Sequence, residues 1–358
     1  MLLTIKNSQM IWQSRFRIQR SLLAMLFLIV GPLAKPQTYS ITDLGTLGGK
    51  NSFAFSINAL GQIAGSSDNG EGKAHAFLWT KDSGMKDLGT LGGVSSKAFG
   101  VNATDQVVGW SLTADNATHA FLWTKSGGMR DLGTLNGSSS YATAINDRGE
   151  IVGYSVDPAS GTTHAFIWTE SSGMQDVGSL GGRVSRALAI NIFGEVVGWS
   201  TTKSVAGHAF IWKSGSGIRE LPVLNDSLES QAVGINASGQ VAGWKSLAGE
   251  VRDSFIWTQD DEIRELGPSS TAFDTRAAGI NAFGQIVGTA FGQDSGMRAF
   301  VWTQSRGTLL LNDLIQADSG WTLSVASAIN NMGQIAGYGM IDEQPHAFLL
   351  TPLTSAAK

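Results

Sequence analysis

Short runs of alternating apolar and polar residues fill the chain after residue 36, and most of them end in a cluster of Gly, Asn or Ser. This pattern is typical of β-strands joined by tight turns. Over residues 97–135 it predicts four strands, at 97–101, 106–110, 119–124 and 129–135. Asn102 suits the first position of the turn between the first two strands, and Ser126-Gly127-Gly128 predicts a hairpin between the last two.

This four-stranded unit recurs along the chain, as three signatures in a fixed order show. Asp-Leu-Gly, or a near copy, begins at Asp43, Asp87, Asp131, Asp176, Glu220, Glu265 and Asp313. Ile/Val-Asn-x-x-Gly-x-Ile/Val-x-Gly has its Asn at positions 58, 102, 146, 191, 236, 281 and 330. His-Ala-Phe-x-Trp has its Phe at 77, 121, 166, 210, 255, 300 and 348. A tandem unit of about 45 residues and four strands indicates a β-propeller, because the coils of the alternative, a β-helix, are usually much shorter.

The two ends of the repeat predict how the propeller closes. The repeat begins with a fourth strand, 39–47, and ends with a third strand, 346–351. Pairing them would complete the last unit and remove two open sheet edges. We therefore predict an all-β fold over residues 37–352, a seven-bladed β-propeller of four-stranded blades, closed by pairing the N-terminal strand with the C-terminal strand. A short tail, 353–358, follows it.

Side-chain size predicts which strand lies innermost. The first strand of each unit carries small alternate residues, such as Ala98 and Gly100, whereas the third carries bulky ones, such as Phe121 and Trp123. Blades converge toward the centre of a propeller, so small residues suit the inner strand and large ones the outer gaps.

The first 36 residues differ from the rest and predict export. Five basic residues and no acidic one surround an apolar run, 21–34, that is too short to span a bilayer comfortably. We predict a signal peptide over 1–36, cleaved near Ala34, and a secreted, periplasmic or extracellular protein with no membrane attachment after cleavage. An uncleaved anchor is the alternative, and translation could start at Met1 or Met10.

Charge and composition narrow the classes of partner. The chain has 25 basic and 29 acidic residues, and losing the five basic leader residues leaves a net charge of −9. An acidic body without a basic run argues against nucleic acid as a ligand. There is no cysteine, which excludes disulfides and cysteine–zinc sites. No phosphate loop or catalytic motif is present, so we expect no cofactor, no metal and no catalytic residue, in a monomer.

The motifs resemble the HAF family of probable extracellular repeats. The His-Ala-Phe triplet is intact at His75, His119, His164, His208 and His346, and the Asp-Leu-Gly-x-Leu-Gly-Gly and Ile-Asn-x-x-Gly motifs also match. The resemblance covers nearly all of residues 39–350. It implies an exported bacterial protein and no established activity. One His per unit, far from the others, is better explained by packing or hydrogen bonding than by metal binding, and the repeated Asp by hydrogen bonding.

Function is expected where the repeats disagree, around the mouth of the central channel where first strands begin and second strands end. The candidate ligand-binding residues on first strands are Lys97, Tyr141, Arg186, Gln231 and Arg276. Those at the ends of second strands are Trp110, Tyr154, Trp199, Trp244 and Tyr338. They could bind an anion or stack on sugar rings, or they could only solvate the rim and pack between blades. The irregular insert 316–322, which contains Trp321, is a further candidate for a functional segment.

These residues favour a noncatalytic binding or interaction module whose ligand is a glycan, a peptide or a partner protein. Two alternatives stay open. One is a propeller enzyme, a polysaccharide hydrolase or lyase, which would need acidic or His residues particular to one or two blades. The other is a purely structural surface protein.

Overall fold

The computed structural model describes residues 38–353, except 136, 205, 223–227, 247–251, 268–273 and 293–295. Within these residues the regular structure is all β-strand, apart from one 3₁₀ helix, η1 (Leu311–Leu314). The predicted leader 1–36, its cleavage site near Ala34, and residues 354–358 of the predicted tail lie outside the described residues.

The strands form four-stranded units in which successive strands pair antiparallel, and we number the units in chain order. Unit 1 is β2 (Gly48–Ile57), β3 (Ile63–Asn69), β4 (Ala74–Thr80) and β5 (Gly84–Asp87). Unit 2 is β6 (Gly92–Val101), β7 (Val107–Thr113), β8 (Thr118–Thr124) and β9 (Gly128–Asp131). Unit 3 is β10 (Ser139–Ile145), β11 (Ile151–Asp157), β12 (Thr162–Thr169) and β13 (Gly173–Gly178). Unit 4 is β14 (Gly181–Ile190), β15 (Val196–Thr202), β16 (Gly207–Lys213) and β17 (Gly217–Glu220).

The remaining units follow the same order. Unit 5 is β18 (Glu229–Ile235), β19 (Val241–Ser246), β20 (Arg252–Trp257) and β21 (Ile263–Glu265). Unit 6 is β22 (Asp274–Ile280), β23 (Ile286–Gly292), β24 (Gly296–Thr303) and β25 (Gly307–Leu310). Unit 7 is β26 (Thr322–Ile329), β27 (Ile335–Ile341), β28 (Gln344–Pro352) and β1 (Tyr39–Asp43). A single parallel bridge, between Thr163 and Val184, joins units 3 and 4 into an eight-stranded sheet, so the described strands make six sheets.

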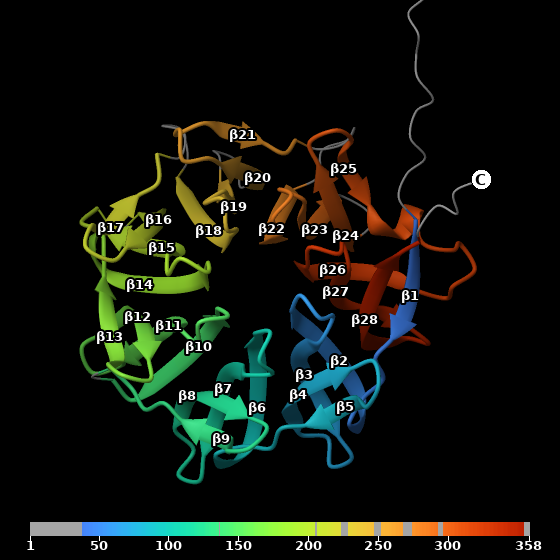
Figure 1. The fold of residues 1–358 in the computed structure, drawn as a ribbon, viewed down its shortest axis with the longest axis horizontal. Helices are drawn as coiled ribbons and strands as arrows, with labels where there is room; N and C mark the ends of the chain where they lie inside the picture. The colour runs from blue at the N-terminus through green and yellow to red at the C-terminus, as the bar shows by residue number, and fades with distance from the viewer. Residues whose placement is uncertain are drawn as a thin grey trace, which may run out of the picture. The chain divides into compact units, whose positions relative to one another are not determined.

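Within the described part of the chain, the units follow one another around a central space, and the first strand of each unit lies nearest the middle (Figure 1). Each first strand contacts the first strand of the next unit, and β26 contacts β2. The predicted pairing of the terminal strands is present: β1 pairs with β28, with Tyr39 opposite Pro352.

Several predicted strand boundaries were wrong. In unit 2 the first strand starts earlier, at Gly92, and the second runs on to Thr113, which shortens the loop after it. The fourth strand ends at Asp131 instead of 135, and β1 likewise ends at Asp43. The Asp turns the chain at this point because its carboxylate accepts a hydrogen bond from the glycine N–H two residues on, 2.7 Å away at Gly133.

The hydrophobic core lies between neighbouring units. One cluster joins Leu78 of unit 1 to Val107, Phe121 and Trp123 of unit 2, and another joins Leu349 of unit 7 to residues of unit 1. One small residue of each first strand, such as Ala98, is buried, and the Phe side chains of the third strands are fully buried. The predicted gradient from small inner to large outer side chains is therefore confirmed.

The repeated Asn side chains form a circle of hydrogen bonds. Each Asn is buried, and its Oδ1 accepts from two backbone N–H groups of its own turn, as those of Ser238 and Gln240 donate to Asn236. Each Nδ2 donates to the backbone carbonyl of the Asn in the next unit, over 2.9–3.2 Å. The bond from Asn330 to Asn58 O, 3.1 Å long, leads from unit 7 back to unit 1. We call these seven bonds the Asn circle.

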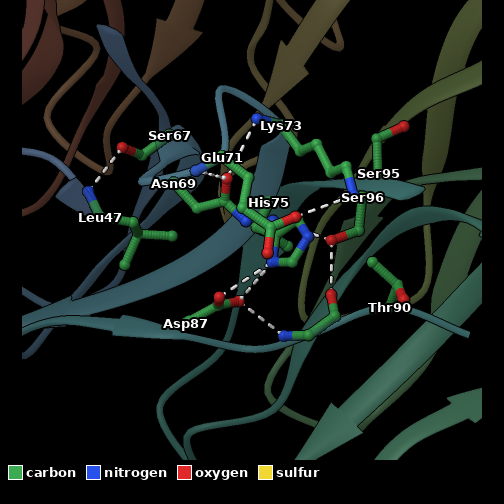
Figure 2. Close-up of polar contacts among 12 residues, drawn as sticks. Leu47, Ser67, Asn69, Glu71, Lys73, His75, Asp87, Thr90, Ser95 and Ser96 are labelled. Carbon is green, nitrogen blue, oxygen red and sulfur yellow. Dashed lines mark hydrogen bonds and ion pairs between the residues drawn. The ribbon is translucent and has the colours of Figure 1, made fainter. Parts of the chain in front are cut away.

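The repeated His and acid residues pair within each unit that has both. Figure 2 shows the contact between His75 and Asp87. His75 Nδ1 lies 2.8 Å from Asp87 Oδ2, and the pair ties the third strand to the fourth. Equivalent pairs join His119 to Asp131, His164 to Asp176, His208 to Glu220, and His346 to Asp43. The structural interpretation of both residues is confirmed, and the His346 pair links the two terminal strands.

Units 5 and 6 depart from this rule. In unit 6, Leu310 lies opposite Phe300, the place that Asp87 holds opposite Phe77, so the match at Asp313 was wrong. Asp313 lies in η1 instead, because the chain bends out of the sheet after Leu310. In unit 5 the acid is Glu265, and its partner is the buried Lys245, with Nζ 2.6 Å from Oε1.

The Asn circle should contribute measurably to stability. Asn236→Ala removes the bond to unit 6 and leaves buried N–H groups unpaired, so we expect a loss of about 2–3 kcal/mol in unfolding free energy. Urea unfolding of the variant and the parent chain measures this difference in unfolding free energy. Asn69→Ala is the control, since Asn69 makes the same pair of turn bonds in a half-exposed hairpin without a link to another unit. Equal losses for the two variants would contradict this role.

Burial of Tyr39 predicts a loss of stability in alkali. Burial raises the pKa of the Tyr39 phenol to about 12, against about 10 in the unfolded chain. The unfolded chain therefore loses this proton first, and the stabilisation present below pH 10 disappears as the pH rises to 12. Between pH 10 and 12 the parent chain should lose about 3 kcal/mol of unfolding free energy through this group. The Tyr39→Phe variant has no such proton to lose, so its unfolding free energy should fall less by that amount. Identical pH profiles from urea unfolding would refute this.

Candidate functional site

Cross-strand pairing positions the predicted mouth residues. In units 2 to 5 the candidate on the first strand lies directly opposite the candidate on the second: Tyr141 faces Tyr154, and Arg186 faces Trp199. The same register pairs Lys97 with Trp110 and Gln231 with Trp244. Directly opposed side chains project from the same face of a sheet, so each pair acts together.

Two local features explain why these pairs point where they do. The first strand bulges after each pair, as between Ala142 and Ala144, which bends the strand. Next to the pair, Gly153 has so little room that a Cβ atom would lie 1.9 Å from the Tyr141 carbonyl oxygen. Only glycine permits this close approach, and the Phe166 ring fills the space on its other side.

The first strands enclose a cavity of about 720 Å³. Seven of the ten candidate residues line it: Trp110, Tyr141, Tyr154, Arg186, Trp199, Gln231 and Tyr338. Its deeper wall is apolar, with Leu188 and Ile280, and a smaller cavity of about 220 Å³ near the Asn circle lies beyond it. A volume of this size suits a small-molecule ligand or a few sugar rings.

One side of the cavity carries an unbroken series of aromatic and cationic contacts across units 2, 3 and 4. The Trp110 and Tyr141 rings meet edge to face at 6.3 Å, and Tyr141 stacks on Tyr154 at 4.9 Å. The Arg186 guanidinium lies 4.8 Å from the Tyr154 ring and 5.5 Å from the Trp199 ring. We call these five residues the aromatic arc. The opposite side is lined by small residues such as Ala277 and Ser327, so the cavity is asymmetric.

Arg186 is the one charged side chain among the described residues that line this cavity. Some other cations of the described chain form an ion pair with a carboxylate, as Arg130 does with Glu170, but Arg186 forms none with a described residue. Its Nε is buried without a hydrogen-bond partner. Burial also raises the pKa of the neighbouring Tyr154, and the Arg186 charge partly opposes that rise. The site therefore holds one unneutralised positive charge on an aromatic wall.

Three candidates do not line the cavity: Lys97, Arg276 and Trp244. Arg276 lies over the Phe291 ring at 4.7 Å, because its own unit has Thr289 where Trp199 lies in unit 4. Trp244 is covered by Arg252, 5.2 Å from its ring.

Trp199 has no such arginine on its neighbouring third strand. Gly207 takes the place of Arg252 in unit 4, where a Cβ would lie 3.2 Å from the Trp199 ring, and the cation over this ring is Arg186 instead. The contrast between Gly207 and Arg252 was visible in the sequence, where this position is Ala or Thr in units 1 to 3, Met in unit 6 and Pro in unit 7.

Sequence reasoning missed a group of charged residues in units 5 and 6. Burial raises the pKa of Asp253, and the Glu265 charge raises it further. Burial also raises the pKa of Asp274, against the attraction of Arg276 and Arg252. Asp253 replaces the repeated His, so its departure from the repeat was the signal. Acids with raised pKa values are candidates for proton transfer.

Three other expectations concern chemistry and location. Trp321, in the irregular insert, packs against the core and meets Phe348 edge to face at 6.0 Å, which gives it a structural role. The described residues contain no group of three or more His, Asp or Glu arranged to hold a metal ion. They also contain no helix with the length and apolarity needed to cross a bilayer.

No family model matches the chain, and no curated protein matches its sequence. Solved structures do match. The structure of streptogramin B lyase has a TM-score of 0.55 and 15% identity, covering 88% of this chain and 98% of that one. The β-propeller domain of the Trilobed protease from Pyrococcus furiosus has a TM-score of 0.57 and 8% identity, covering 90% and 100%. The BP39L lectin from Burkholderia pseudomallei has a TM-score of 0.52 and 10% identity, and the match covers 87% of this chain and 98% of the lectin.

These likenesses show a β-propeller fold and, at such low identity, the fold alone. The predicted all-β propeller is confirmed, and the β-helix was the wrong alternative. The resemblance to HAF repeats stays a prediction from the motifs.

If Arg186 serves binding rather than folding, its removal should cost little stability. We expect Arg186→Gln to change the unfolding free energy by no more than about 1 kcal/mol, because lost cation–π contacts are offset by removing an unpaired buried donor. Glu265→Gln, which removes the ion-pair partner of the buried Lys245, should cost about 2 kcal/mol or more. Thermal unfolding of both variants checks this, and a larger loss for Arg186→Gln would contradict it.

Proposed function

We propose that the chain is an exported, noncatalytic binding module with a closed seven-bladed propeller, which binds a glycan, a peptide or a segment of a partner protein in the mouth of its central channel. The observation that carries this proposal is the aromatic arc, with its unpaired Arg186. Aromatic faces and one placed charge around a concave space are the usual composition of a ligand site. The aromatic residues also pack between units, so one set of side chains would serve both purposes.

The finer points of the proposal have separate support. Closure into seven blades is supported by the pairing of β1 with β28 and by the bond from Asn330 to Asn58. Export rests on the leader and on the resemblance to HAF repeats. The same resemblance implies a bacterial protein in an extracellular or periplasmic location, and a monomer is the oligomeric state we propose.

A propeller enzyme acting on a polysaccharide is the second candidate. The matching structures include one named as a lyase and one named as a lectin, so the fold is compatible with both catalysis and binding. An enzyme would have to use Asp253 and Asp274, the acids with raised pKa values. No acidic side chain of the described residues lines the cavity, which favours binding.

Arrays of glycans and peptides, probed with the full chain, test the proposal. We expect binding that falls at least about tenfold in Trp199→Ala, because a stacked indole typically contributes 1–3 kcal/mol to a site. Phe283→Ser is the control, since Phe283 is 74% exposed on the turn at the other end of the strands. Hydrolysis of a polysaccharide panel, lost in Asp253→Asn, would support the enzyme instead. No ligand at all would favour a structural protein.

A further inference from the structure

We infer that the ligand of the aromatic arc is an acidic glycan, in which a uronic-acid carboxylate binds Arg186 while sugar rings lie against Trp199 and Trp110. This inference rests on the proposed function and specifies its ligand class. It is argued from the charge, the donors and the ring chemistry of the cavity.

The charge of the cavity selects an anion. Arg186 is the one charged residue among the described lining residues, and no carboxylate of the described chain pairs with it. The two flanking rings hold the guanidinium plane between units 3 and 4. A planar group held in this way is suited to two parallel hydrogen bonds with a carboxylate. Of its three nitrogens, Nε alone is buried without a partner, which leaves the Nη atoms to make those bonds.

The chemistry of the wall favours a sugar over a peptide. Two of the four rings in the arc carry phenolic hydroxyls, at Tyr141 and Tyr154, and Gln231 and Thr143 add further polar groups to the lining. A sugar ring presents an apolar face together with several hydroxyls, which matches rings with polar edges. An apolar peptide side chain would instead require a dry pocket.

The geometry of the arc allows more than one sugar ring to bind. Its contacts run without a break across three units, from Trp110 to Trp199. The acid should lie at the Arg186 end, and the neutral part of the glycan should extend toward Trp110. The charge then decides which glycan binds, and the rings supply affinity for any sugar.

Calorimetric titration of the full chain with trisaccharides of galacturonate, mannuronate and guluronate, and with their methyl esters, tests this inference. Esterification removes the charge and keeps the ring. We expect one acid to bind at least about tenfold more tightly than its ester.

The Arg186→Gln variant should remove this difference while the ester still binds, and the Arg186→Lys variant should keep only part of the difference. Trp199→Ala should weaken acid and ester alike. Arg130→Gln is the matched control, because Arg130 also lies over an indole, that of Trp168, but already pairs with Glu170.

Each other outcome overturns the inference. If acid and ester bind equally, or if Arg186→Gln weakens both alike, the proposed binding function stands with a neutral glycan as ligand. Binding only of peptides ending in a free carboxylate would keep the site and replace its ligand class. If no ligand of either array binds in a manner that depends on Trp199, the proposed function fails as well.

Discussion

The hydrogen bond from each repeated Asn to the next Asn carbonyl is the constraint on which the rest of the structure depends. Each bond is short and buried, and it links the inner turn of one unit to that of its neighbour. Inside the protein such a bond is costly to break, because the groups it satisfies would be left unpaired. As the chain of bonds returns from Asn330 to Asn58, no unit can tilt without disturbing two others. The circle thus fixes the inner strands that carry the mouth residues at their other end.

The hydrogen bonds between inner turns explain how a repetitive protein can hold an asymmetric site. The same backbone position carries Tyr141 in unit 3, Arg186 in unit 4 and Gln231 in unit 5, so the sequence can vary there without altering the fold. The aromatic arc exists because three neighbouring units have compatible side chains. Arg186 lies between two rings and forms no ion pair with a described residue, so no carboxylate of the described chain neutralises its charge.

The repeated features were predictable from the sequence, and those that depend on a neighbouring side chain were not. Seven copies of the Asn turn and five of the His triplet predicted the strand order, and the two ends of the repeat predicted the closing pair. Asn was predicted only as a turn residue, because its bond to the next unit depends on how neighbouring units pack. The bulge between Ala142 and Ala144 was not predicted, because it depends on the register of two strands. Arg276 and Arg186 looked equivalent in sequence, yet they differ in structure since only Arg186 has aromatic residues on both sides. The acids of units 5 and 6 were not predicted as functional, because they lie outside the mouth positions at which function was expected.

The central claim, that the described units form one closed and cooperative ring, is tested most directly by differential scanning calorimetry of the purified chain. If the circle couples all units, the ring unfolds as one, and the calorimetric enthalpy equals the van't Hoff enthalpy. An open stack would instead lose its terminal units first, as linear repeat proteins can. A calorimetric enthalpy well above the van't Hoff value, with β1 and β28 melting before the other strands, would contradict the account.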